Sequence, residues 1–101
     1  MSLEQIRIQI DEIDRQIIAL VARRNDCVRQ VVDHKRSVDD IHVPEREAEV
    51  LANVRRLAIE LGADVEVVER IYRTLLAAFV DFEVRHKDAE GKPEPIATDG
   101  A

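Results

Sequence analysis

The chain has 101 residues, of which 46% are hydrophobic and only 3% aromatic, and its formal net charge is −6. A chain of this length forms a single domain with a modest core, and an acidic surface repels phosphate, so binding to nucleic acid is not expected. Neither a long apolar run nor a charged-then-apolar leader is present, so we expect no membrane segment and no secretory signal. The single cysteine, Cys27, cannot form an internal disulfide, which is typical of a reducing cytoplasm.

The first predicted element is a long helix that begins near residue 3. Ser2 and Gln5 have capping-box spacing, in which each side chain hydrogen-bonds to the backbone of the other residue. Because no Gly or Pro interrupts before Ser37, this helix would span roughly 35 residues and about 50 Å. Its apolar residues recur at steps that place them on one stripe, and they are Leu3, Ile6, Ile10, Ile13, Ile17, Leu20, Val28 and Val31.

A polar loop over residues 37–43 should separate the first helix from a second, shorter one. Pro44 suits the first helical position, because its missing N–H would have no partner there. The second helix should end at Gly62, since glycine readily adopts the left-handed conformation of a helix end.

A third helix is expected to begin after Asp64, whose side chain is placed to cap it, and to end near His86. Residues 88–101 contain two prolines and two glycines and show no apolar periodicity. We therefore expect one helical domain over residues 1–87, followed by a disordered tail over residues 88–101.

The length of the first helix predicts a homodimer. A compact domain of this size has a radius of gyration of about 13 Å, so a helix of about 50 Å projects beyond it with its apolar stripe uncovered. Two shorter helices cannot cover that stripe, whereas a second copy of the long helix can. The expected fold is all-α, with one long and two shorter helices per chain in an intertwined, two-fold homodimer.

Charged residues continue the apolar stripes of all three predicted helices. Arg24 and Lys35 lie on the first helix, Arg46 and Glu47 begin the second, and Glu83 follows the apolar face of the third. Burying an unpaired charge is unfavourable, so these residues could simply form ion pairs inside a bundle. Taken together, three cations and two carboxylates from three helices predict a pocket that binds a small anion with a hydrogen-bonding group of its own.

Arg7 lies about 25 Å from Arg24 along the same helix, and an antiparallel partner helix could bring its Arg7 to this pocket. The sequence offers no Ser–His–acid pattern, no His or Cys cluster with metal spacing and no glycine-rich phosphate loop. We therefore expect no metal and no cofactor, and a reaction driven by conformation and electrostatics.

These residues resemble the all-helical, type II chorismate mutase family. The resemblance covers residues 3 to about 86 and implies a cofactor-free rearrangement of chorismate to prephenate in phenylalanine and tyrosine biosynthesis. It also implies a cytoplasmic homodimer in which each active site borrows one arginine from the partner. The segments that carry it are Ile6-Arg7 before Ile13-Asp14, Ile18 to Arg24, Lys35, and Val43 to Glu47.

The resemblance implies how the cationic residues bind the two substrate carboxylates. Arg7 of the partner subunit would grip one carboxylate and Arg24 the other. Arg46 would support the carboxylate end, and Lys35 would contact a carboxylate and the ether oxygen. The apolar walls of the site would be formed by Val31, Val50, Leu76 and Val80.

Two carboxylates have implied roles at the other substrate oxygens. Glu47 would accept a hydrogen bond from the ring hydroxyl, and Glu83 would donate one to the ether oxygen where many members have glutamine. A carboxyl group donates only when it is protonated, so activity should decline as the pH rises through the pKa of Glu83. Val43 and Phe79 also depart from the family, which commonly has small or acidic polar residues there.

Three alternatives remain open at this point. An isochorismate pyruvate-lyase of the same fold typically lacks the acidic residue at Glu47, so this residue favours chorismate as substrate. A mutase for amino-deoxychorismate is the second alternative. The third is a non-catalytic helical dimer that acts as an adaptor, which would tolerate the loss of Arg24.

Overall fold

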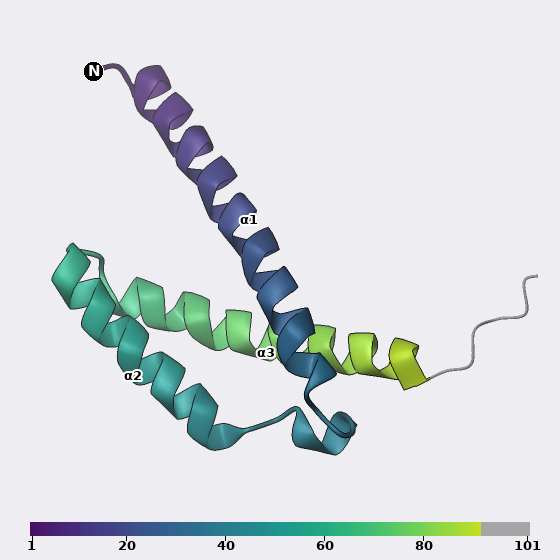
Figure 1. Cartoon of the computed structure of the whole chain (residues 1–101). Helices are drawn as coiled ribbons and strands as arrows, with labels where there is room; N and C mark the ends of the chain where they lie inside the picture. Colours follow the sequence, from purple (N-terminus) through teal and green to yellow (C-terminus); the bar gives the residue numbers. More distant parts are fainter. Residues whose placement is uncertain (92–101) are drawn as a thin grey trace, which may run out of the picture.

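The computed structural model describes residues 1–91, which fold into three α-helices and one turn of 3-10 helix. In Figure 1, α2 and α3 form a hairpin, whereas α1 crosses α3 and its N-terminal half projects away from both. The described residues contain no strand, and the predicted all-α fold is confirmed. The elements are α1 (Leu3–Asp33), η1 (Val38–Asp40), α2 (Pro44–Leu61) and α3 (Val65–Gly91).

α1 begins as its capping signal predicts. The backbone N–H of Gln5 donates to the Ser2 hydroxyl at 3.1 Å, and the Ser2 N–H donates to the Gln5 side chain at 2.8 Å. The helix ends at Asp33, a few residues before the predicted limit at Ser37. There the N–H groups of His34 and Lys35 donate hydrogen bonds to backbone carbonyls three residues earlier in the chain. These shorter-range bonds tighten the last turn and end the helix without a Gly or Pro.

The predicted start and end of α2 and the predicted start of α3 are confirmed. Pro44 occupies the first turn of α2, and Gly62 ends this helix with a left-handed φ of 75°. The Asp64 side chain accepts a hydrogen bond from the Val67 N–H at 2.9 Å, which caps α3. Each of these ends depends on a local backbone requirement, which is why the sequence signals are reliable here.

α3 extends beyond its predicted end near His86 and continues to Gly91. The residues that follow His86 are Lys-Asp-Ala-Glu, none of which breaks a helix, so the helix continues through them. The expected tail therefore begins too early at residue 88. The remainder of that expectation, residues 92–101, lies outside the described residues.

α3 is the element on which both other helices pack. Phe79 of α3 is buried together with four small or branched side chains from the other elements, namely Val32, Ile41, Val54 and Ala58. An ion-pair cluster also joins α2 to α3, because Glu69 accepts from Arg55 and, at 2.8 Å, from Arg73. These hydrogen bonds hold the pKa of Glu69 below its usual value.

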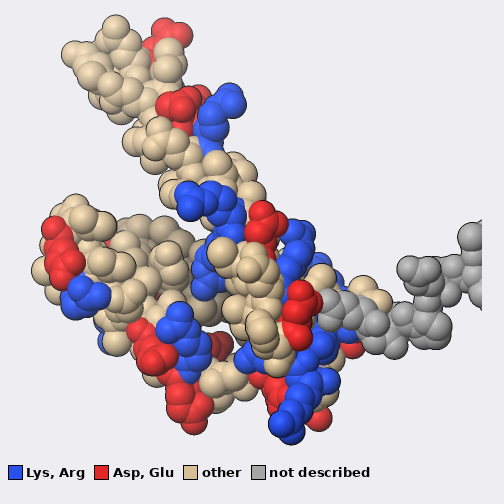
Figure 2. All heavy atoms as spheres, in the orientation of Figure 1, with Lys and Arg blue, Asp and Glu red and all other residues tan. Residues whose placement is uncertain are grey.

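The N-terminal half of α1 leaves its apolar stripe uncovered. All of residues 1–20 are exposed, and the large apolar side chains from Ile6 to Leu20 are 41–68% exposed. The radius of gyration is 18.2 Å, compared with about 13 Å for a compact domain of this size. In Figure 2 the projecting end of α1 shows mostly uncharged side chains, with a few charges among them. An uncovered apolar stripe of this kind supports the expectation that α1 packs against a second copy of the chain.

Candidate active site

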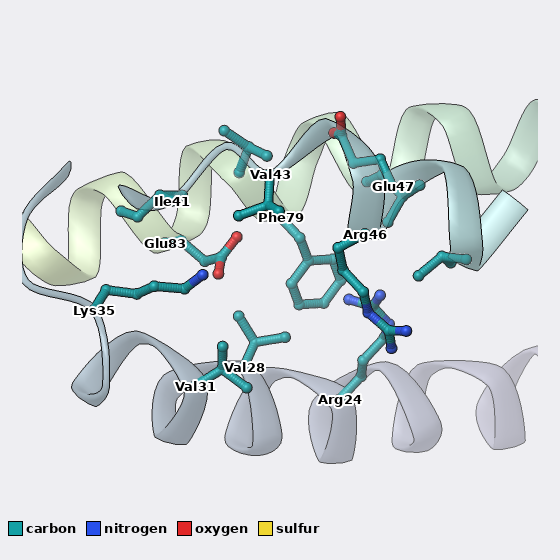
Figure 3. A pocket seen from close by; sticks show the side chains of 13 residues that line it. Arg24, Val28, Val31, Lys35, Ile41, Val43, Arg46, Glu47, Phe79 and Glu83 are labelled. Carbon is teal, nitrogen blue, oxygen red and sulfur yellow. The ribbon is translucent and has the colours of Figure 1, made fainter. Parts of the chain in front are cut away.

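A cavity of about 270 Å³ opens where the C-terminal half of α1 meets the loop before α2 and the middle of α3. Figure 3 shows the side chains that surround it. Nine of the ten predicted site residues line this cavity, and Arg7 does not. The lining comprises five charged and eight apolar residues: Arg24, Lys35, Arg46, Glu47 and Glu83, with Val28, Val31, Ile41, Val43, Val50, Leu76, Phe79 and Val80.

Lys35 and Glu83 form one end of the cavity. Lys35 follows the last turn of α1, Glu83 lies on α3, and their charged groups point toward each other in Figure 3. Partial burial raises the pKa of the Glu83 carboxyl, while the positive charges of Lys35 and Arg24 act in the opposite direction without cancelling this effect. Glu83 therefore binds a proton more readily than a glutamate in water, and the protonated form can donate a hydrogen bond into the cavity.

Arg24 is held against an aromatic ring. Its guanidinium carbon lies 4.4 Å from the centroid of the Phe79 ring, within the range of a cation–π interaction. Phe79 is buried, so the ring is a fixed support. The guanidinium keeps its donors in a planar fork, an arrangement that matches a carboxylate.

Arg46 and Glu47 line the cavity from the first turn of α2. Arg46 is largely exposed and donates to Glu49 at 3.3 Å. The Oε2 atom of Glu47 lies 2.8 Å from Nε2 of His42. In Figure 3 the Glu47 carboxylate lies apart from the charged groups of Arg24, Lys35 and Glu83. The cavity thus has a cationic region, with Glu83 beside it, and the Glu47 carboxylate lies apart from this region.

Four lining residues were not among the predicted site residues. The sequence pattern places Val28 only on the helix stripe, and it marks Val43 and Phe79 only as departures from the family. Ile41 was missed because it lies in a segment expected to be a polar loop. Its isolation as a large apolar residue between Asp40 and His42 was the available signal, and it is only 5% exposed.

Arg7 is exposed on the projecting half of α1 and does not reach the cavity of its own chain. The role predicted for this residue would therefore require a second copy of the chain. Among the residues that the structure describes, no three His, Cys, Asp or Glu side chains are grouped so that they could hold a metal ion.

Comparison with known proteins places the chain in a family. The sequence model for chorismate mutase type II matches residues 6–84, close to the predicted extent of the resemblance. The chain belongs to the type II chorismate mutase family. No solved structure matches it in the corresponding search.

Members of this family and related enzymes are similar along most of the chain. The chorismate mutase of Methanocaldococcus jannaschii is 35% identical over 75 residues, which cover 73% of this chain and 76% of that protein. The bifunctional chorismate mutase/prephenate dehydratase of Aquifex aeolicus is 32% identical over 95% of this chain. The chain spans only 28% of that bifunctional protein and 20% of the T-protein of Enterobacter agglomerans.

An enzyme with a different name is also similar. The isochorismate pyruvate lyase of Pseudomonas aeruginosa is 32% identical over 84 residues, which cover 83% of either chain. Membership of the chorismate mutase family therefore gives the fold. The choice between two related substrates rests on the cavity itself.

None of the helices in the described part of the chain is long and apolar enough to cross a membrane.

Proposed function

We propose that the chain catalyses the rearrangement of chorismate to prephenate in the cavity between its helices. The observation that carries this proposal is the layout of charge in an apolar cavity: cations from α1 and α2, a proton-binding carboxyl beside Lys35, and a separate acceptor at Glu47. Chorismate is a dicarboxylate with an ether oxygen and a ring hydroxyl, so each of its polar groups has a complementary partner. Family membership supports the same reaction.

Binding would select the reactive shape of the substrate. The reaction requires a compact, chair-like conformer in which the side chain lies over the ring. Arg24 and Arg7 of the partner subunit would hold the two carboxylates, with support from Arg46, and the apolar walls would exclude extended conformers. Holding two ends of a flexible substrate in the reacting geometry removes part of the entropic barrier.

The chemical step moves electrons around a ring of six atoms. The bond between carbon and the ether oxygen breaks while a new carbon–carbon bond forms, and no proton or leaving group is exchanged. Negative charge builds up on the ether oxygen as its bond lengthens. The Lys35 ammonium and the protonated Glu83 carboxyl would stabilise this charge more in the transition state than in bound chorismate, which is the condition for a faster reaction.

A homodimer completes the proposed site. The uncovered stripe on α1 would pack against a second copy, and Arg7 would then reach the cavity of the partner subunit. Each cavity would contain residues of both chains. We place the reaction in the cytoplasm, where its product would enter phenylalanine and tyrosine biosynthesis.

The second candidate is an isochorismate pyruvate-lyase activity, which the similarity to the Pseudomonas aeruginosa enzyme supports. The two substrates differ in the position of the ring hydroxyl, so the acceptor that meets this hydroxyl distinguishes them. Glu47 provides an acceptor at one end of the cavity and favours chorismate.

The test is to incubate purified protein separately with chorismate and isochorismate at pH 5 and to identify the products by chromatography. We expect chorismate to disappear with formation of prephenate and isochorismate to be a poor substrate. Release of pyruvate from isochorismate without turnover of chorismate would support the lyase instead. Turnover of neither substrate would contradict both enzymatic candidates.

A further inference from the structure

We propose that His42, which does not line the cavity, positions Glu47 for the ring hydroxyl of the substrate and keeps it away from the arginines. This inference rests on the proposed function and adds a residue to it. Nε2 of His42 lies 2.8 Å from Oε2 of Glu47. An ionised carboxylate can only accept, so Nε2 carries the hydrogen and donates it.

The contact uses one carboxylate oxygen and leaves the other available. Within the described residues, His42 is the only hydrogen-bond partner of the Glu47 side chain. The Glu47 side chain is 31% exposed, so protein atoms cover most of it. A glutamate side chain loses rotational freedom when it is fixed, and a hydrogen bond already made in the free protein removes part of this loss from substrate binding.

The backbone beside His42 is anchored on both sides. Ile41, the preceding residue, is buried, and Val43, the following residue, lines the cavity. The Val43 carbonyl accepts from the N–H groups of both Arg46 and Glu47 at 3.1 Å. His42 and Glu47 are therefore joined through the backbone of the first turn of α2 as well as through their side chains. The imidazole of His42 is exposed, but the backbone from which it extends is fixed.

Separation of charge explains why such a contact matters. Arg24, Arg46 and Glu47 all line one cavity, so a Glu47 side chain without a partner could turn toward a guanidinium. An ion pair of that kind would occupy donors that the substrate carboxylate needs. The structure instead has Glu47 paired with His42, and Figure 3 shows the carboxylate apart from Arg24. By pairing with Glu47, His42 thus leaves the Glu47 carboxylate available for the ring hydroxyl and the guanidinium groups available for the substrate carboxylate.

The test is a double-mutant cycle with chorismate as substrate, using His42→Ala, Glu47→Gln and the two changes combined. We expect His42→Ala to lower kcat/KM roughly tenfold, the effect of losing one hydrogen bond to a charged group. The same change should cause almost no further loss when Glu47 is already Gln, because the charged acceptor is then absent.

Two matched variants distinguish positioning from a structural role. His42→Gln retains an N–H donor and should recover most of the activity, while Asp39→Ala, an exposed change in the same loop, should leave activity unchanged. Urea unfolding should give nearly the same midpoint for wild type and His42→Ala.

The inference is overturned if His42→Ala causes no loss of kcat/KM. It is also overturned if this change lowers kcat/KM by the same factor in the wild type and in the Glu47→Gln variant. In those cases wild-type turnover of chorismate would leave the proposed function intact. A wild-type protein that does not convert chorismate would overturn the proposed function and this inference with it.

Discussion

Glu83 can support the proposed reaction only in its protonated form. Partial burial raises its pKa against the opposing charges of Lys35 and Arg24. The fraction of Glu83 that can donate is therefore complete at low pH and declines as the pH rises through this raised pKa. The direction of the pH dependence follows from the chemistry of one side chain.

We predict that kcat/KM for chorismate is higher at pH 5 than at pH 8, and that Glu83→Gln removes most of this difference. The amide of glutamine donates at any pH, so its rate has no reason to follow the protonation of residue 83. Initial rates between pH 4.5 and 8.5 measure both profiles. An unchanged profile in Glu83→Gln would remove Glu83 from the mechanism.

Arg24 lies over the Phe79 ring at the cationic side of the cavity. We predict that Arg24→Ala lowers kcat/KM by roughly a hundredfold or more, because an oriented charge that binds the reacting anion is lost. The helix content measured by circular dichroism should not change. The neighbouring, exposed Arg23→Ala is the control and should retain its rate. A fully active Arg24→Ala would favour a non-catalytic adaptor.

The ends of the helices depend on interactions between neighbours in the sequence. The Ser2–Gln5 capping box, Pro44, Gly62 and Asp64 each satisfy a local backbone need, and each end is where the sequence predicts it. The C-terminal ends of α1 and α3 carry no such signal. α1 closes earlier than predicted, through hydrogen bonds to carbonyls three residues back, and α3 continues until Gly91.

The turn between α2 and α3 offers a test of whether local backbone requirements set the helix ends. Gly62 has a φ of 75°, and an added Cβ would meet no atom within 4 Å, so the cost of replacement is backbone strain alone. We predict that Gly62→Ala lowers the free energy of unfolding by about 1 kcal/mol. Gly62→Asn should lose less, because asparagine tolerates this conformation better. Urea denaturation measures both changes, and equal losses would contradict the explanation.

α1 is the element that links fold and assembly. Its C-terminal half packs on α3 and lines the cavity, whereas its N-terminal half exposes an apolar stripe. One helix therefore belongs to the core of its own chain at one end and, by our proposal, to the partner at the other.

We predict that Ile13→Glu, in the middle of the exposed stripe, converts the homodimer to a weaker or dissociated species. A charge there would be buried without a partner in the proposed interface, which is strongly unfavourable. Analytical ultracentrifugation over a range of concentrations measures the shift. Gln16→Glu on the same helix is the control and should remain dimeric. A wild-type chain that sediments as a monomer would contradict the homodimer.

The proposed sharing of Arg7 can be tested by mixing two inactive variants. Arg7→Ala and Arg24→Ala should each have little activity as homodimers, because each lacks one arginine in both sites. When the two are unfolded and refolded together, half of the dimers would be mixed, and each mixed dimer would contain one site with both arginines. Activity should then recover to about a quarter of the wild-type value. No recovery would place Arg7 outside the partner's site.

Sequence alone determined the helices, most of the residues that line the cavity and the expectation of an uncovered stripe, because capping and periodicity act between residues close in the chain. Nine of the ten predicted site residues meet in one cavity, since charges on apolar stripes point inward wherever helices pack. Tertiary structure decided the rest. Only packing brings Ile41 into the cavity wall, sets Phe79 beneath Arg24, raises the pKa of Glu83 and places His42 against Glu47. These features depend on distances between residues of different elements, and periodicity does not specify them.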